Sequence, residues 1–262
     1  MVRRGPYLEP AIDRLPEPLV TGCRSMGGDG DDGAVTGHPL DNAVWQALST
    51  HHGALAEVKG RSRRYRINAS FFGGVDSFDE ESWEDLAALV GPSSEIALFC
   101  SDVPPVPDAW SEVARGIGEQ MVVSGDDIAA AEPVEARPLG DEHVAQMLDL
   151  VAVAQPGPFR PRTIELGRYY GYFEGERLLA MAGERLHLEG YTEISAVCTH
   201  ADVRGRGLAS SLTLHVAMGI IERGEQPFLH VADDNHNARR IYERLGFAVR
   251  RPIEFALVES PA

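Results

Sequence analysis

One stretch of sequence decides the fold, Glu193-Ile-Ser-Ala-Val-Cys-Thr-His-Ala-Asp-Val-Arg-Gly-Arg-Gly-Leu-Ala-Ser210. Its first half alternates apolar and polar residues, which predicts a strand. A glycine-rich turn follows at residues 204–207, and a helix begins directly after it. The apolar positions of that helix recur at helical spacing, at Leu208, Leu212, Val216 and Ile220. The sequence therefore predicts a strand, a tight turn and a helix in direct succession.

The turn has the composition of an anion site. Gly205 and Gly207 let the main chain approach a ligand closely. The first N–H groups of a helix have no partner within it and lie at the positive end of its dipole, which suits a pyrophosphate. Arg204 and Arg206 add positive charge at the rim. A P-loop is excluded because no Gly-Lys-Ser/Thr follows, and the dinucleotide pattern G-x-G-x-x-G fails at Ser210. Taken alone, the stretch is also compatible with a plain glycine turn.

A second pattern lies downstream, Asn235-His-Asn-Ala-Arg-Arg-Ile-Tyr-Glu-Arg-Leu-Gly-Phe247. It resembles the GNAT signature Asn-x-x-Ala-x-x-x-Tyr-x-x-x-Gly-Phe. The earlier Arg204-x-x-Gly207-x-Ala209 resembles the acyl-CoA pyrophosphate motif of the same superfamily, Gln/Arg-x-x-Gly-x-Gly/Ala. Because both patterns occur in order and in matching predicted secondary structure, the chain resembles the GNAT N-acetyltransferases over roughly residues 132–258.

The predicted elements around these motifs define an α+β domain over residues 132–262. Their order is an antiparallel meander followed by strand–helix–strand–helix–strand, which predicts a mixed, mostly antiparallel sheet flanked by helices. The GNAT resemblance implies the same fold. The predicted ranges are an edge strand at 134–138, a helix at 141–153, strands at 168–174, 177–188 and 191–199, a helix at 206–222, a strand at 227–231, a helix at 236–245 and a strand at 247–258.

The N-terminal part of the chain is predicted to contain a leader and a second unit. Residues 1–37 are rich in Gly, Asp, Pro and Arg, which predicts a disordered leader. Residues 38–126 predict an α/β domain, separated from the GNAT-like domain by a linker at 126–132. Helices are expected at 42–55 and 82–90, a strand at 96–100 and a short apolar segment at 122–123. This unit lacks both motifs, and we hypothesise that it is a degenerate GNAT-like repeat.

Composition excludes several classes of protein. The formal charge of −16 and the pI near 4.9 argue against binding to nucleic acid or to an anionic membrane, and mildly favour amine substrates. A solvated acidic surface is the plainer interpretation of that charge. Three cysteines, Cys23, Cys100 and Cys198, rule out a disulfide framework. The lack of a signal-like or membrane-spanning segment leads us to expect a cytoplasmic location.

The resemblance implies acetyl-CoA as cosubstrate, no metal, and direct transfer of the acetyl group to a primary amine in a ternary complex. The main chain of Val197, Cys198 and Thr199 is expected to pair with the pantetheine arm. Asn235 matches an amide that contacts CoA, with helix capping as the alternative. The turn expected to hold the pyrophosphate comprises Arg204, Gly205, Arg206, Gly207, Leu208, Ala209 and Ser210.

Two catalytic residues are predicted. Tyr242 matches the phenol that protonates the leaving thiolate, although it is alternatively a packed aromatic residue. Glu193, on the central strand, is the candidate base for the amine, and a solvated strand-edge glutamate is the alternative. Glu165 and Tyr191 are secondary candidates for the base. Cys198 is interpreted as a small buried residue rather than a nucleophile.

Other functions stay open at this point. The chain is alternatively an inactive acyl-CoA-binding sensor or interaction module, or an enzyme with a longer acyl donor that resembles the glycine N-acyltransferases. The acceptor is expected to be a small-molecule or peptide amine, with no nucleic-acid or membrane partner. Variable loops such as residues 156–166 select it, and Phe159 and Tyr169 either line its slot or pack in the core. The resemblance leaves a homodimer open.

Overall fold

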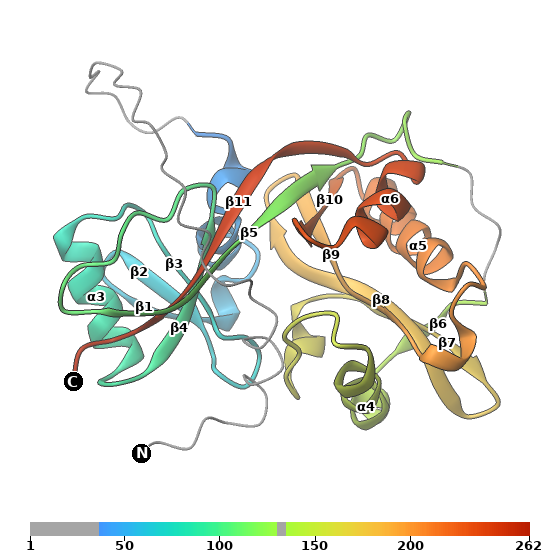
Figure 1. The fold of residues 1–262 in the computed structure, drawn as a ribbon, viewed down its shortest axis with the longest axis horizontal. Helices are drawn as coiled ribbons and strands as arrows, with labels where there is room; N and C mark the ends of the chain where they lie inside the picture. The colour runs from blue at the N-terminus through green and yellow to red at the C-terminus, as the bar shows by residue number, and fades with distance from the viewer. Residues whose placement is uncertain (1–36, 130–134) are drawn as a thin grey trace.

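A computed structural model describes residues 37–129 and 135–262. The predicted leader lies outside the described residues except for Gly37, and so does part of the predicted linker. The described chain forms one 11-stranded sheet in the order β1-β2-β3-β4-β11-β5-β10-β9-β8-β7-β6, with helices packed on its faces (Figure 1). The α+β class predicted from the sequence is confirmed.

The N-terminal region confirms the predicted helix at 82–90 and strand at 96–100. The helix expected at 42–55 is shorter, because the backbone leaves the helical conformation at Thr50 (φ −122°, ψ −108°). Strands β1 to β3 are absent from the prediction. The elements are η1 (Pro39–Asn42), α2 (Ala43–Ser49), η2 (Gly53–Leu55), β1 (Ala56–Lys59), β2 (Ser62–Tyr65), β3 (Phe72–Val75), α3 (Glu80–Val90), β4 (Glu95–Cys100) and β5 (Ser111–Val122).

The C-terminal region agrees with the prediction more closely. Every helix and strand predicted after residue 140 is present with ends within two residues, if the 3-10 turn η3 is counted with α4. The elements are β6 (Arg137–Leu139), η3 (Asp141–His143), α4 (Val144–Ala154), η4 (Thr163–Leu166), β7 (Tyr169–Glu174), β8 (Arg177–Leu188), β9 (Tyr191–Thr199), η5 (Ala201–Val203), α5 (Leu208–Glu222), β10 (Gln226–Ala232), α6 (His236–Arg244) and β11 (Ala248–Glu259).

The two regions repeat one order of elements. In the first, α2 precedes the strands β1 to β3, and α3 leads to β4. In the second, α4, β7 to β9, α5 and β10 occur in the same sequence, and β3–β4 and β9–β10 are both parallel pairs. The last strand of each region joins the sheet of the other, because β5 pairs with β10 and β11 pairs with β4. This repeat supports the hypothesis of a GNAT-like N-terminal half, and the sheet continues across the predicted domain boundary.

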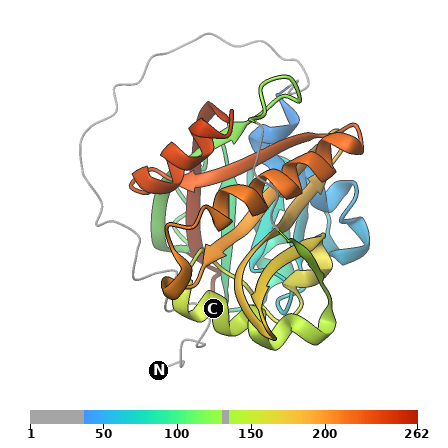
Figure 2. The ribbon, with the colours of Figure 1, turned by 90° about the vertical axis from the view of Figure 1, so that its right-hand side faces the viewer.

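The helices of the C-terminal region cover its strands on both faces. In Figure 2 the orange α5 runs across the strands, with the red α6 to its left and the green α4 below. The predicted stripe of α5 is buried, since Leu208, Leu212, Val216 and Ile220 all belong to one apolar cluster with Tyr242. In the part of the chain that the structure describes, no helix is long and apolar enough to cross a bilayer.

Candidate active site

A notch opens in the sheet where β9 and β10 separate. The two strands pair in parallel only as far as Ile194 and Leu229. From there β9 continues along β8, whereas β10 continues along β5. The main-chain groups of residues 197–199 that point away from β8 therefore have no strand partner in the described sheet. An extended amide chain is able to pair with such groups as an added strand.

Ala196 bends β9 at the start of the notch. Its φ of 54° lies in the left-handed region, which residues other than glycine rarely adopt. At the same place Met181 of β8 faces Cys198 while Gly183 faces Ser195, so β9 contains one more residue than β8. A bulge of this kind increases the local twist and turns a strand away from its neighbour. The strained residue thus marks the point where β9 leaves β10.

The glycine-rich turn beyond β9 leaves the start of α5 open. Gly205 and Gly207 have φ values of 80° and 76°, and a Cβ atom at either position would meet nothing within 4 Å. Gly207 is the N-cap of α5, so no side chain caps the helix, and its first turn contains no acidic residue. The N–H groups of Leu208, Ala209 and Ser210 therefore have no side-chain cap at the positive end of this 15-residue helix.

The two arginines of the turn differ in their surroundings. Arg206 contacts Glu174 with 2.6 Å between Nη1 and Oε1, and donates a hydrogen bond of 3.0 Å to the Tyr172 hydroxyl. Arg204 is exposed and forms no ion pair within residues 37–129 and 135–262. The Arg204 guanidinium is therefore available to bind a phosphate, whereas the Arg206 guanidinium would first have to break its contact with Glu174.

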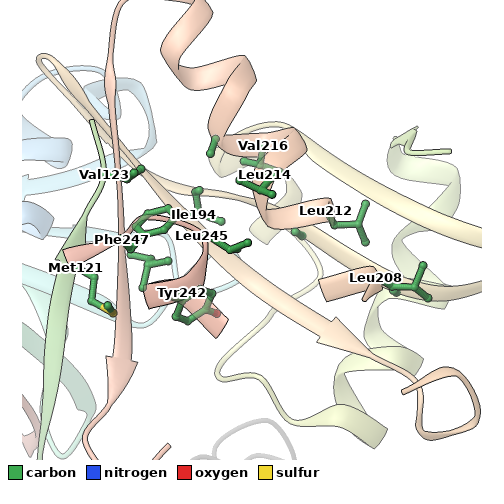
Figure 3. Close-up of a cluster of buried hydrophobic side chains, with 14 of the residues drawn as sticks. Met121, Val123, Ile194, Leu208, Leu212, Leu214, Val216, Tyr242, Leu245 and Phe247 are labelled. Atoms are coloured by element: carbon green, nitrogen blue, oxygen red, sulfur yellow. The ribbon is translucent and has the colours of Figure 1, made fainter. Parts of the chain in front are cut away.

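Tyr242 places a protonated phenol beside the notch. Figure 3 shows its ring in the apolar cluster that α5 and α6 share with Leu245 and Phe247. The Tyr242 and Phe247 rings meet edge to face at 6.1 Å. Burial, reinforced by the nearby Cys198 thiol, raises the pKa of Tyr242 to about 12. The phenol consequently keeps its proton throughout the neutral range.

Comparison with known proteins shows the family to which this chain belongs. The family model of FR47-like proteins matches residues 169–256, which contain the notch, the turn and Tyr242. A Novosphingobium aromaticivorans protein assigned to the GNAT acetyltransferases is 32% identical, with a TM-score of 0.79 over 86% of this chain and 100% of that chain. The chain belongs to the GNAT family of acetyltransferases.

The GNAT likeness extends into the N-terminal region, because residues 135–262 are less than half of the chain while the alignment covers 86% of it. A GCN5-related N-acetyltransferase from Kribbella flavida shares the fold at 18% identity, with a TM-score of 0.55 over 84% of this chain and 96% of that chain. A comparison with curated proteins gives no match.

Two residues expected to contact CoA, Asn235 and Cys198, have structural roles in this GNAT protein. Asn235 caps α6, since its Oδ1 accepts a hydrogen bond of 3.1 Å from the Ala238 N–H. The capping alternative is thus realised, and it leaves the Asn235 amide N–H groups exposed for another contact. Cys198 is buried, and burial raises the pKa of its thiol to about 12. A thiol of that pKa is a poor nucleophile, as its interpretation as a small buried residue requires.

Glu193 is a buried ion-pair residue. Its side chain is 0% exposed, so the alternative of a solvated strand-edge glutamate is wrong. Arg185 donates to it through Nε (2.8 Å) and Nη2 (2.5 Å), and His230 Nδ1 lies 2.7 Å from its Oε1. Burial alone would raise the pKa of Glu193, but these partners lower it to about 2. Such a stable carboxylate is a weak base, so the observed geometry disfavours its predicted catalytic role.

The proton of His230 can be placed from its neighbours. The Gln120 side-chain amide is oriented by two hydrogen bonds: its Nε2 donates to the Leu40 carbonyl at 2.9 Å, and its Oε1 accepts from Arg250. The Gln120 atom that lies 3.0 Å from His230 Nε2 is therefore the amide nitrogen, which is a donor. Nε2 therefore accepts, and Nδ1–H donates to Glu193. The Glu193–His230 pair ends on a buried amide rather than at the notch. Sequence reasoning missed Arg185 and His230, because a lone charge within a strand pattern does not reveal its partner.

The two secondary base candidates both have partners within the protein. Tyr191 begins β9, where β9 and β10 are still paired, and its hydroxyl contacts His38 Nε2 at 3.2 Å. Glu165 is ion-paired with Arg162 in the loop before β7. Phe159 and Tyr169 are both buried and meet edge to face at 5.7 Å, in the same apolar cluster as Cys198.

Proposed function

We propose that this GNAT protein transfers the acetyl group of acetyl-CoA directly to a primary amine in a ternary complex. The supporting observation is the notch, which has an open helix N-terminus beyond one end and a buried protonated phenol beside it. The pyrophosphate would lie against the N–H groups of residues 208–210, with Gly205, Gly207 and Arg204 around it. The pantetheine amides would pair with the main chain of Val197, Cys198 and Thr199.

The chemistry divides into two proton movements. The amine nitrogen attacks the thioester carbonyl carbon, the C–S bond breaks, and the acetyl group stays on nitrogen. The nitrogen loses one proton to solvent, and the sulfur departs as a thiolate that then takes one proton from solvent. Because the pKa of Tyr242, about 12, exceeds that of a thiol, about 8.5, the phenol acts mainly by donating a hydrogen bond to sulfur as negative charge develops.

The amine loses its proton to solvent in this mechanism, because the carboxylate of Glu193 is buried and strongly ion-paired. We expect kcat/KM to rise about tenfold per pH unit below the pKa of the amine and to level off above it. A bell-shaped profile with a decline near neutral pH would contradict the assignment of an acid with a pKa of about 12. The measurement is kcat/KM against pH with one amine of known pKa.

The function itself is tested by release of free CoA thiol from acetyl-CoA with a panel of primary amines. Release that depends on an added amine supports the proposal. Tight acetyl-CoA binding without turnover for any amine would instead indicate a sensor, and preference for longer acyl-CoA competitors would indicate a different donor. A matched assay with acetyl-CoA and no amine gives the background hydrolysis.

A further inference from the structure

Two arginine-rich loops, one from each half of the chain, are in contact. Residues 66–71 precede β3, and residues 155–168 connect α4 to β7. The loops are held together where Arg162 N–H donates to the Asn68 carbonyl at 3.0 Å, and where the Thr163 hydroxyl donates to the Ala69 carbonyl at 2.6 Å. On a chain with a net charge of −16, their charged side chains are Arg66, Arg160, Arg162, Arg168 and Glu165.

Arg160 is the unusual member of this group. Its side chain is half-buried, and its guanidinium carbon lies 5.7 Å over the Phe71 ring. Its main chain is fixed by the N–H that donates to Thr163 Oγ1 at 2.8 Å. Glu165, the one carboxylate of the two loops, is paired with Arg162 instead, and Arg160 has no ion pair in the part of the chain that the structure describes.

A half-buried guanidinium without a counterion is costly to maintain, because the charge has lost part of its hydration and gained only the Phe71 ring in return. Burial accordingly lowers the pKa of Arg160, and no neighbouring charge opposes the effect. An incoming anion would remove this cost. A carboxylate fits best, since its planar pair of oxygens matches the fork of a guanidinium.

The loop that carries Arg160 also reaches the catalytic strand. Phe159, the preceding residue, packs in one apolar cluster with Tyr169 and Cys198, on the face of the sheet covered by α4. The Tyr169 hydroxyl in this cluster is buried and has no hydrogen-bond partner among the described residues. Phe159 thus connects the loop of Arg160 to β9 on the face of the sheet opposite α5, from which an acceptor would enter.

We infer, on the basis of the proposed acetyl transfer, that the acceptor is an amine that carries a carboxylate, and that Arg160 binds this carboxylate. Free amino acids and peptides with an acidic group near the amine have this chemistry. Cationic polyamines do not, and the four arginines of the two loops would repel them. The positive charge of the two loops thus favours an anionic group on the acceptor, whereas the negative net charge of the chain favours cationic amines.

The test compares acceptors that differ only in charge, such as β-alanine and β-alaninamide, and an acidic peptide with its amidated counterpart. We expect Arg160→Gln to lower kcat/KM for the carboxylates by about 10–100-fold, mainly through KM, and for the amides by less than about threefold. Arg160→Lys should restore part of the loss. Arg63→Gln is the matched control, because Arg63 also lies over an aromatic ring, at 4.9 Å from Trp45, away from these loops. Equal losses for acids and amides would overturn the inference.

A second readout does not require turnover. The CoA-loaded protein is heated with the N-acetylated acids or their amides at constant ionic strength, and the shift in Tm reports binding. The inference requires larger shifts with the acids for the wild type, and no such difference for Arg160→Gln. If the acids and the amides shift Tm equally in the wild type, or if Arg160→Gln keeps the same preference for the acids, the inference is overturned. Failure of every amine to release CoA thiol contradicts only the proposed function. Free amino acids and peptides are distinguished by which of them gives the larger shift.

Discussion

The two halves of the molecule share their topology but differ at the start of the helix that follows the third strand. In the N-terminal half, Asp79 caps α3 by accepting from the Ser82 N–H at 2.9 Å, and Glu80 and Glu81 occupy the first turn. Arg61 then binds Asp79 at 2.6 Å. In the C-terminal half, the N-cap residue of α5 is Gly207, which has no side chain to cap the helix. The start of α3 is capped by the protein's own carboxylate, and the start of α5 has no side-chain cap.

The halves differ again beyond their fourth strands. After β10 the chain forms α6 and presents Tyr242, whereas after β4 it runs to β5 with no helix between them in the described residues. The parallel pairing of β3 with β4 also ends early, at Gly73 and Leu98, and the Phe72 and Phe99 rings stack at 5.7 Å beside it. The comparison indicates that the two halves share a fold and differ in the uncapped start of α5 and in the helix α6 that carries Tyr242.

Removing the phenol should have the largest effect on the active half. We expect Tyr242→Phe to lower kcat about 10²–10⁴-fold, because the hydrogen bond to the departing sulfur is lost. Binding of acetyl-CoA should change little. Steady-state kinetics and titration of acetyl-CoA check both values, with Tyr170→Phe as the control for loss of a tyrosine hydroxyl. A kcat within threefold of the wild type would remove Tyr242 from the mechanism.

Breaking the buried Arg185–Glu193 ion pair of the C-terminal half should mainly affect stability. Glu193→Gln leaves Arg185 buried without its full counterion, which costs about 3–5 kcal/mol of unfolding free energy. Glu57→Gln, which breaks the partly exposed Arg64 pair, should cost about 0–1 kcal/mol. Urea unfolding of both variants measures the difference. If Glu193→Gln were as stable as Glu57→Gln but inactive, the predicted role of Glu193 as a base would be favoured again.

The same pair gives a pH dependence of known sign. Glu193 has a pKa of about 2 in the folded chain and 4.5 as a reference, so it binds a proton less readily when folded. Its contribution to stability is present above about pH 4.5 and is lost as the pH falls toward 2. The wild type should therefore lose more stability than Glu193→Gln across this interval. Parallel stability curves for the two proteins would contradict the assignment.

The smallest effect is expected at the filled helix end of the N-terminal half. Asp79→Ala removes the cap of α3 and should lower Tm by about 2–4 °C. Asp79 has a pKa of about 2, mainly because of the Ser82 N–H, so its contribution is present above about pH 4 and is lost toward pH 2. Acetyl-CoA affinity should be unchanged, and a changed affinity would show that this half takes part in binding.

The sequence predicted the C-terminal half well because its strands and helices have strong periodic patterns and clear glycine turns. It missed β2, where Arg63 and Arg64 interrupt the pattern between the buried Ser62 and Tyr65. It also reduced the 12-residue β5 to a short apolar segment. Most of β5 is polar, and its pairing with both β10 and β11 holds it in the sheet. Such strands depend on distant partners, which local sequence does not specify.

The same limit applies to the site. The motifs located the turn, the notch strand and Tyr242, because these depend on residues close together in the chain. The partner of Glu193 could not be predicted, since an ideal hairpin that pairs Leu188 with Tyr191 would place Leu186 opposite Glu193. The β8–β9 register shifts between His187 and Glu184 and brings Arg185 to Glu193 instead. An irregular register is a property of the packed sheet.

The claim that only the C-terminal half binds acetyl-CoA, at the open end of α5, is tested most directly by calorimetric titration. Gly207→Glu and Gly207→Gln impose the same backbone strain, so their difference isolates the added charge, and Gly224→Glu, at φ 79°, repeats the strain and the charge beyond the other end of α5. We expect one site per chain in the wild type, affinity about 100-fold weaker or more in Gly207→Glu than in Gly207→Gln, and wild-type affinity in Gly224→Glu. Two sites per chain, or unchanged affinity in a folded Gly207→Glu variant, would contradict the claim.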